Sequence, residues 1–143
     1  MNDDLKTLLD REVLRYNRPE FIDDDPVQFP RLYTDKRDIE IAALLVSTIA
    51  WGNRTMICRD ASRMLAMLGH QPYRYMMERT YEELPQGNVH RTFFNANLAH
   101  YLRGLRGIYA EYGSLEDFAA AVGAPQSETP AWHLAGALSA RLT

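Results

Sequence analysis

The side chains that most often carry chemistry are few in this sequence and lie far apart. None of the histidines lies three or four residues from another, so no helical zinc pair is predicted; they are His70, His90, His100 and His133. The single cysteine, Cys58, cannot form a disulfide within the chain, and we expect a partly buried structural thiol. Acidic residues 23–25 favour a solvated turn over a divalent metal site, because Pro26 follows at once.

The sequence also lacks the short motifs that build common reaction centres. It has no glycine-rich phosphate loop, no Gly-x-Ser-x-Gly elbow and no Cys-x-x-Cys pair. We therefore predict no catalytic residue, no metal and no cofactor. We do not expect this chain to be an enzyme by itself.

Two groups of basic residues are candidates for binding phosphate. One group, Arg31, Lys36 and Arg37, surrounds the start of the second predicted helix. The other, which consists of Asn88, His90 and Arg91, precedes the fifth predicted helix, where exposed backbone amides can bind an anion. We predict anion contacts at His90, Arg91, Arg31 and Arg37. The alternative is that these arginines pair with some of the 19 acidic side chains.

Composition is that of an ordinary globular protein and excludes several classes of protein. Of the 143 residues, 46% are hydrophobic and 24% are charged, which suits a single folded domain. The net charge of -3 argues against a dedicated nucleic-acid binder, and no helix has a one-sided basic face for a membrane surface. The start, Met-Asn-Asp-Asp, is acidic, and the longest apolar stretch, residues 41–51, is too short to cross a bilayer. We predict a soluble cytoplasmic protein without membrane contact.

Apolar residues recur at helical spacing through most of the chain. We predict helices over residues 3–16, 38–51, 54–68 and 94–112, with shorter helices from Pro72 and after Ser114, and a last one from Pro130. Residues 18–36 are expected to form an ordered extended segment, residues 80–91 a loop, and no strand is predicted. Because the helix over residues 38–51 is apolar on nearly all sides, it should be central and buried. The fold class is therefore all-α, an orthogonal bundle of about six to seven helices around that helix.

The last predicted helix carries a leucine stripe that needs a partner surface. Leu134, Leu138 and Leu142 lie on one side, and the sequence ends at Thr143 within this pattern. We predict that residues 1–143 form one domain that is the amino-terminal part of a longer protein. A fraying terminal helix is the alternative. We also predict that residues Pro130–Thr143 mediate homo-oligomer contacts.

Two motifs resemble an uncharacterised bacterial family, a domain of unknown function. The first is DPVQFPRLYTDKRDIEIAALLVSTIAWG, which spans Asp25 to Gly52. It combines a DP-x-x-FP-x-x-Y segment with a D-x-EIAA helix that ends in a small residue, an aromatic residue and glycine. The second is HRTFFNANLAHYL, His90 to Leu102. The resemblance covers most of the chain and implies no known chemistry.

A more distant resemblance is to helix-hairpin-helix DNA glycosylases of the endonuclease III type. Leu44, Leu45 and Ser47, followed by the stripe from Ile57 to Leu68, are similar to a buried helix and the amphipathic helix after it in those enzymes. Their Leu-Pro-Gly-Val-Gly hairpin and catalytic aspartate have no counterpart here. The resemblance therefore implies the helical scaffold part of a DNA-repair-related protein without its catalytic half, and nucleic acid as a partner only together with that half. The alternative is a non-enzymatic interaction or self-association module.

Overall fold

Helices build nearly all of the computed structural model, which describes residues 3–142. Within that range the chain forms eight α-helices, four short 3-10 helices and one small hairpin. The predicted all-α fold class is confirmed. Met1, Asn2 and Thr143, to which the predicted domain 1–143 and the predicted segment Pro130–Thr143 extend, lie outside the described residues.

The core helix is α3 (Lys36–Thr48), as the sequence predicted. Its start is fixed by Asp35, whose side chain accepts a hydrogen bond from the amide of Arg37 at 2.8 Å. Ile41, Ala42, Leu45 and Val46 are buried on it, followed by Ile49 just past its end. Ser47 and Thr48 both donate to the carbonyl of Leu44, so their hydroxyls are satisfied within the helix.

Helix α4 (Arg54–Met67) packs beside α3 and is capped by Asn53. Its predicted stripe is confirmed, because every member is buried: Ile57, Ala61, Met64, Leu65 and Leu68. Helix α5 (Pro72–Met77) begins at the proline that predicted it.

The carboxy-terminal half packs around one long helix, α6 (Asn95–Tyr112), which ends at Gly113 with a positive φ of 84°. Helix α7 (Leu115–Ala121) follows, capped by Ser114 as predicted, and η4 (Ala124–Gln126) leads to α8 (Pro130–Leu142). Helix α8 packs on α6. The close approach requires Gly104, because a Cβ there would lie 2.7 Å from a methyl group of Leu142.

Three parts of the chain differ from the sequence-based expectation. Residues 18–36 are ordered but not extended: they form α2 (Glu20–Asp23), η1 (Pro26–Gln28) and η2 (Pro30–Leu32). The two prolines start the 3-10 turns, since their fixed φ suits a first helical turn. Residues 80–91 were expected to form a loop, but they begin with the 3-10 helix η3 (Thr80–Glu83). The structure also contains two short strands that were not predicted, β1 (Asn88–His90) and β2 (Phe93–Phe94). Strands this short carry no alternating pattern that a sequence can reveal.

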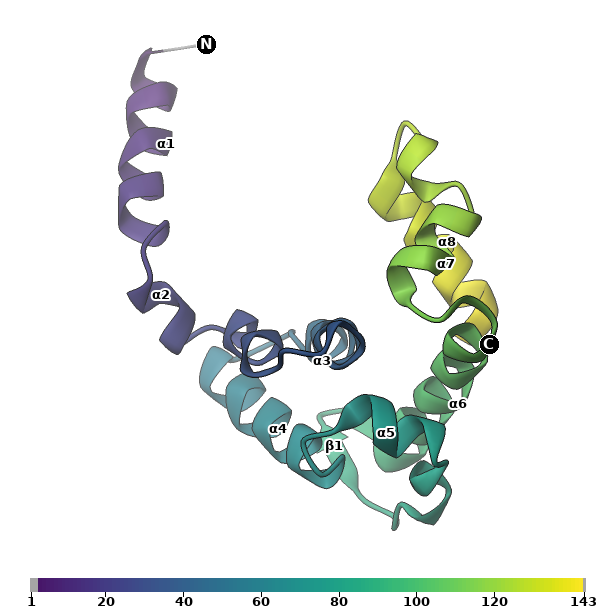
Figure 1. The fold of residues 1–143 in the computed structure, drawn as a ribbon. Coiled ribbons are helices and arrows are strands. Elements are labelled where there is room, and N and C mark those ends of the chain that lie inside the picture. Colours follow the sequence, from purple (N-terminus) through teal and green to yellow (C-terminus); the bar gives the residue numbers. More distant parts are fainter. Residues whose placement is uncertain (1–2, 143) are drawn as a thin grey trace.

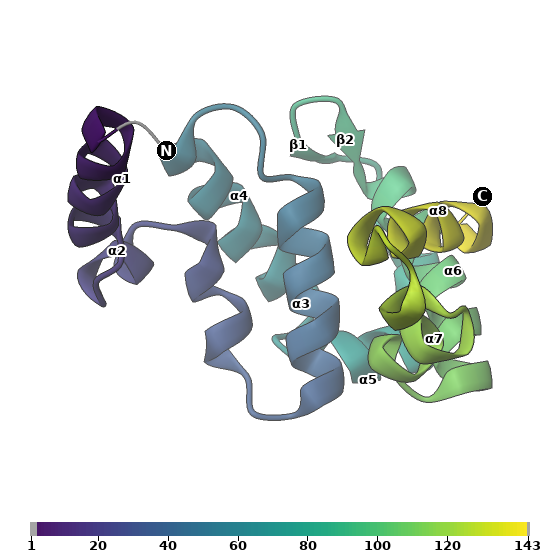
Figure 2. The same ribbon diagram turned by 90° about the horizontal axis from the view of Figure 1, so that it is seen from above.

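The arrangement leaves one helix apart from the others. Figures 1 and 2 show α1 (Asp3–Tyr16) at one end of the molecule, joined through α2 to the body formed by α3–α8. The bounds of α1 agree with the predicted helix, yet its leucines remain exposed. In the body, α3 crosses between α4 on one side and α5–α8 on the other (Figure 2).

Candidate functional site

The turn from α3 to α4 presents an exposed aromatic side chain, Trp51, which is 42% exposed. The next residue, Gly52, has φ of 106°, a conformation that side chains other than glycine rarely adopt. A Cβ at Gly52 would lie 2.5 Å from the guanidinium of Arg91. Glycine is therefore required here both by the backbone and by the neighbour that closes over it.

Arg91 reaches this turn from the β1–β2 hairpin. The hairpin is antiparallel and irregular, with Asn88 opposite Phe94 and His90 opposite Phe93. Arg91 has a positive φ of 47° at its tip. Its guanidinium lies 5.3 Å from the centre of the Trp51 ring, within cation–π range. We call these two exposed side chains the Trp51–Arg91 pair.

A buried polar network lies beneath the Trp51–Arg91 pair. His90 is fully buried, and its Nδ1 lies 2.7 Å from Oδ2 of Asp60 on α4. Its Nε2 lies 3.0 Å from the carbonyl oxygen of Trp51. Each ring nitrogen of His90 therefore has an oxygen partner. His90 therefore ties the α3–α4 turn to α4 through the hairpin.

Asp60 is the charged centre of this network. Burial acts to raise the pKa of Asp60, but hydrogen bonds from Arg59 and His90 and the charges of Arg59 and Arg63 outweigh it and hold that pKa below its ordinary value. Arg59 and Arg63 lie 3.0 and 3.4 Å from Oδ1 of Asp60. Arg63 also donates to the carbonyls of Asn88 and Val89, at 3.1 and 2.6 Å, so it joins α4 to the hairpin beside the Asp60–His90 contact.

A hollow opens beside the exposed face of Trp51. It has a volume of about 220 Å³ and is lined by Trp51, Thr92, Phe93, Asn97, His100 and Tyr101. A second hollow of about 340 Å³, between α3, α6 and α8, shares His100 and Tyr101 with the first. The first hollow is the groove beside Trp51, and it has these two side chains of α6 in common with the second.

The structure does not gather the predicted anion-binding residues at one place. Arg31 and Arg37 lie near the start of α3 and the Trp51–Arg91 pair lies past its end, about 20 Å away for a helix of this length. Arg37 pairs with Asp35 at 2.7 Å and lies over the ring of Tyr73. His90 is enclosed, whereas Arg91 faces outward. Anion binding stays a prediction, and of the second group Arg91 is the member placed to perform it.

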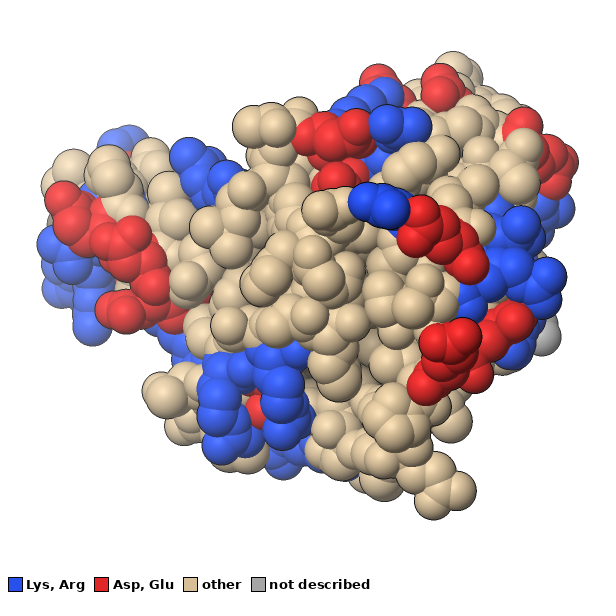
Figure 3. Space-filling view, turned by 60° about the horizontal axis from the view of Figure 1, so that its bottom comes forward, with Lys and Arg blue, Asp and Glu red and all other residues tan. Residues whose placement is uncertain are grey.

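The surface charge around the site is local rather than general. Figure 3 shows one compact group of Lys and Arg side chains on the face in view, whereas elsewhere on that face basic and acidic side chains are interspersed. Arg59 and Arg63 are 65% and 51% exposed although both contact Asp60, so they add positive charge to the outer side of α4.

Sequence reasoning missed Asp60, although it left a signal. Asp60 falls on the buried stripe of α4, three residues after Ile57 and four before Met64. A carboxylate on such a stripe requires a buried partner. The partner, His90, lies 30 residues away, and the sequence does not identify it.

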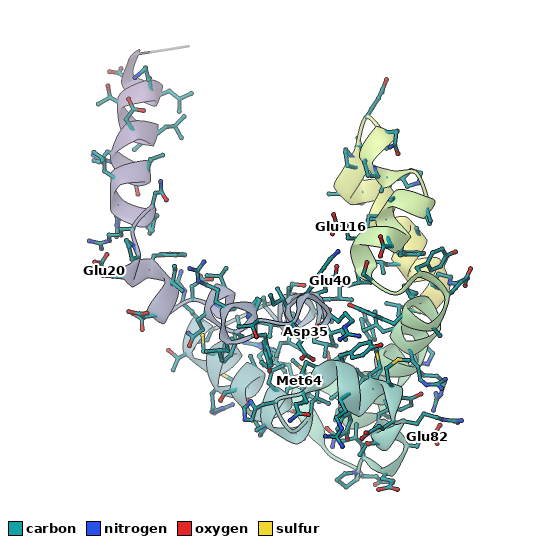
Figure 4. The ribbon with its side chains drawn as sticks, viewed as in Figure 1. Glu20, Asp35, Glu40, Met64, Glu82 and Glu116 are labelled. Carbon is teal, nitrogen blue, oxygen red and sulfur yellow. The ribbon has the colours of Figure 1, made fainter. Side chains whose placement is uncertain are left out.

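The motif residues of the amino-terminal half act as tertiary helix caps. Asp38 on α3 accepts a hydrogen bond from the amide of Tyr73 in the first turn of α5 at 2.8 Å. Glu40 accepts from the amides of Leu115 and Glu116 at the start of α7, at 2.9 and 3.2 Å. Figure 4 shows Glu40 and Glu116 between α3 and α7. The D-x-E motif thus holds two other helices on α3 through their amino-terminal amides.

Glu40 also binds the hydroxyl of Tyr109 on α6, at 2.8 Å. Burial, followed by this hydrogen bond, raises the pKa of Tyr109 far above its ordinary range. The carboxylate therefore joins α3, α6 and α7 at one point. This use of an acidic side chain is structural.

No chemical centre of another kind is visible in the described part. Across residues 3–142, no three His, Cys, Asp or Glu side chains converge in a way that would hold a metal ion. Within the same range, each helix is too short or too polar to span a bilayer. Burial, followed by the charge of nearby Asp25, raises the pKa of Cys58, which favours the protonated thiol.

The fold and the site define an all-helical protein whose motif residues stabilise the helix packing and whose exposed features centre on the Trp51–Arg91 pair. Comparison with known families matches residues 25–140 to a family described as a protein of unknown function, DUF2400. The chain belongs to that family. No curated protein and no solved structure matches it.

Proposed function

We propose that this chain is the helical scaffold part of a DNA-glycosylase-like, DNA-repair-related protein, and that base excision depends on residues outside it. The single observation that carries the proposal is the Trp51–Arg91 pair, held at the α3–α4 turn by the buried Asp60–His90 contact. The turn follows Leu44, Leu45 and Ser47, the residues that resemble those enzymes.

The chemistry of the Trp51–Arg91 pair suits nucleic acid. A guanidinium binds phosphate, and an exposed indole stacks on a base, a contact worth about 1–3 kcal/mol. The groove beside it offers further aromatic and polar side chains. A bacterial origin and a cytoplasmic location belong to the same proposal, supported by the family resemblance and by the single cysteine.

The charge balance sets how strongly this chain should bind. Each neutralised phosphate contributes about -0.9 to the slope of log K against log salt concentration, and Arg91 is the exposed arginine of the pair, so binding through it should be weak. The net charge of -3 opposes it further. We therefore expect a gel-shift titration with duplex DNA to show weak binding or none, and no released base. Strong duplex binding that falls steeply with salt would contradict a scaffold role.

A second measurement tests the Trp51–Arg91 pair itself. Trp132→Phe leaves Trp51 as the single tryptophan, because the chain has two. At low salt, a single-stranded oligonucleotide should quench the fluorescence of Trp51, and Arg91→Ala should weaken the titration. Arg103→Ala is the matched control, since Arg103 is also an exposed arginine that lies over an aromatic ring, that of Tyr81. An equal loss in both variants, or no quenching in the parent, would overturn nucleic-acid contact at this pair.

The second candidate function is a non-enzymatic interaction or self-association module. In the sequence, the stripe of Leu134, Leu138 and Leu142 favours such a module. In the structure these side chains pack on the core of the same chain, so the stripe does not require a homo-oligomer contact through Pro130–Thr143. The observation that now favours the module is the exposed apolar face of α1.

A further inference from the structure

The apolar side chains of α1 lie uncovered along most of its length. Leu5, Leu8, Leu9, Val13 and Tyr16 are between 43% and 56% exposed. With about 3.6 residues per turn they share one face, centred on Leu5, Leu9 and Tyr16. Among residues 3–142, the aromatic ring that meets this helix is that of Phe21, whose edge contacts Tyr16 in the last turn. Glu12 lies within the stripe, where it pairs with Arg11 and Arg15 of the same helix. An exposed apolar face of this kind marks an interaction surface.

The charges beside this face are arranged to suit a second copy of the same helix. Asp4, Arg11 and Arg15 lie along one flank of the apolar stripe at helical spacing, with the acid in the first turn and Arg15 in the last. Two such helices placed antiparallel bring Asp4 of one copy beside Arg15 of the other, twice. Their dipoles also oppose, which favours this orientation over the parallel one.

The spacing of the stripe fixes a symmetric register. Leu5 and Val13 each lie four residues from Leu9. In an antiparallel pair centred on Leu9, the two Leu9 side chains meet at the two-fold axis, and Leu5 of each copy faces Val13 of the other. Both copies therefore bury the same patch, as a two-fold interface requires.

We infer that α1 mediates homodimerisation of this chain, as an antiparallel helix pair with Leu9 at its centre. A helix of 14 residues spans about 21 Å, so the buried area falls at the low end for specific interfaces. The dimer should therefore be weak and depend on concentration. The inference does not involve the Trp51–Arg91 pair, so it stands or fails independently of the nucleic-acid proposal.

Matched substitutions on the two faces of α1 test the interface. Leu9→Glu places a charge at the centre of the pair and should raise the dimer dissociation constant at least tenfold in sedimentation velocity runs. Leu14→Glu is the control, because Leu14 is 80% exposed and lies on the opposite face. The same residue type is introduced in both, so helix propensity changes equally. A monomer at all concentrations, or equal effects of both variants, would overturn the dimer.

Cysteine crosslinking tests the orientation. In a Cys58→Ala background, a mixture of Leu5→Cys and Val13→Cys chains should form a disulfide-linked heterodimer under mild oxidation. Leu5→Cys alone should form few crosslinks, because its counterparts lie at opposite ends of the pair. Efficient crosslinking of Leu5→Cys alone would show a parallel pair and contradict the inferred arrangement.

Discussion

Replacing His90 by alanine tests whether the buried network holds the α3–α4 turn. The change leaves Oδ2 of Asp60 and the carbonyl of Trp51 without their partner, at atoms that lie 2.7 and 3.0 Å from the ring. A buried acceptor that loses its partner costs about 1–3 kcal/mol, and a charged acceptor costs more. Two acceptors lose their partner here, but Arg59 and Arg63 still neutralise the other carboxylate oxygen, so we expect a loss of about 3 kcal/mol in the free energy of unfolding. For a domain of this size that lowers Tm by about 10 °C.

Urea unfolding followed by circular dichroism measures this loss, and Arg59→Ala is its control. Arg59 is 65% exposed, so its pair with Asp60 should contribute only about 0.2–1 kcal/mol. If His90→Ala cost less than about 1 kcal/mol, or no more than Arg59→Ala, the argument from burial would be refuted.

The same network predicts a pH dependence. The folded state lowers the pKa of Asp60 from its ordinary value of 3.8, so the stabilisation is complete above that value and is lost as the pH falls through the folded pKa. Asp60→Asn removes this dependence, and the stability gap between it and the parent should narrow at acidic pH.

Three further predictions concern helix packing and the thiol. Gly104→Ala places a Cβ 2.7 Å from a methyl group of Leu142 and should lower the free energy of unfolding in urea by about 1–3 kcal/mol. In the control, Gly107→Ala, the new Cβ meets nothing within 4 Å, so the free energy of unfolding should rise by up to about 1 kcal/mol. Equal effects would contradict close packing of α8 on α6. Glu40→Ala removes the acceptor of the first two amides of α7 and should speed their hydrogen exchange, leaving the first turn of α4 unaffected; unchanged exchange would contradict the capping role. Cys58 should react with iodoacetamide at pH 8 more slowly in the folded than in the urea-unfolded chain, because its folded pKa is raised; equal rates would contradict its burial.

The sequence predicted local structure best where the signal is local. Apolar spacing located the helices and Ser114 marked a helix start, because each signal acts within one turn of its own position. Boundaries shifted where another segment of the chain paired with the backbone. Phe94 was predicted to lie within the fifth helix, but it pairs in the hairpin with Asn88 and α6 begins after it.

The candidate site could be predicted only in part, since its members come from three segments. Arg91 was predicted as an anion contact, but the sequence did not indicate that its neighbour would be Trp51. His90 was predicted beside it with the same role. Its side chain instead points inward to Asp60, in an irregular strand whose last two residues, Val89 and His90, are both buried.

By itself the sequence determined the class of fold, the helix positions, the caps and the lack of the usual catalytic motifs, since composition and short-range periodicity carry that information. Tertiary structure alone decided the partners of buried charges. Asp60 meets His90 across 30 residues, and Glu40 meets the start of α7 across 75. A carboxylate on a buried helix face implies that a hydrogen-bond donor lies nearby. Many donor side chains in the sequence could fill that role, so the sequence does not identify which one does. Which donor arrives is set by how the helices pack, and packing depends on all of their faces at once.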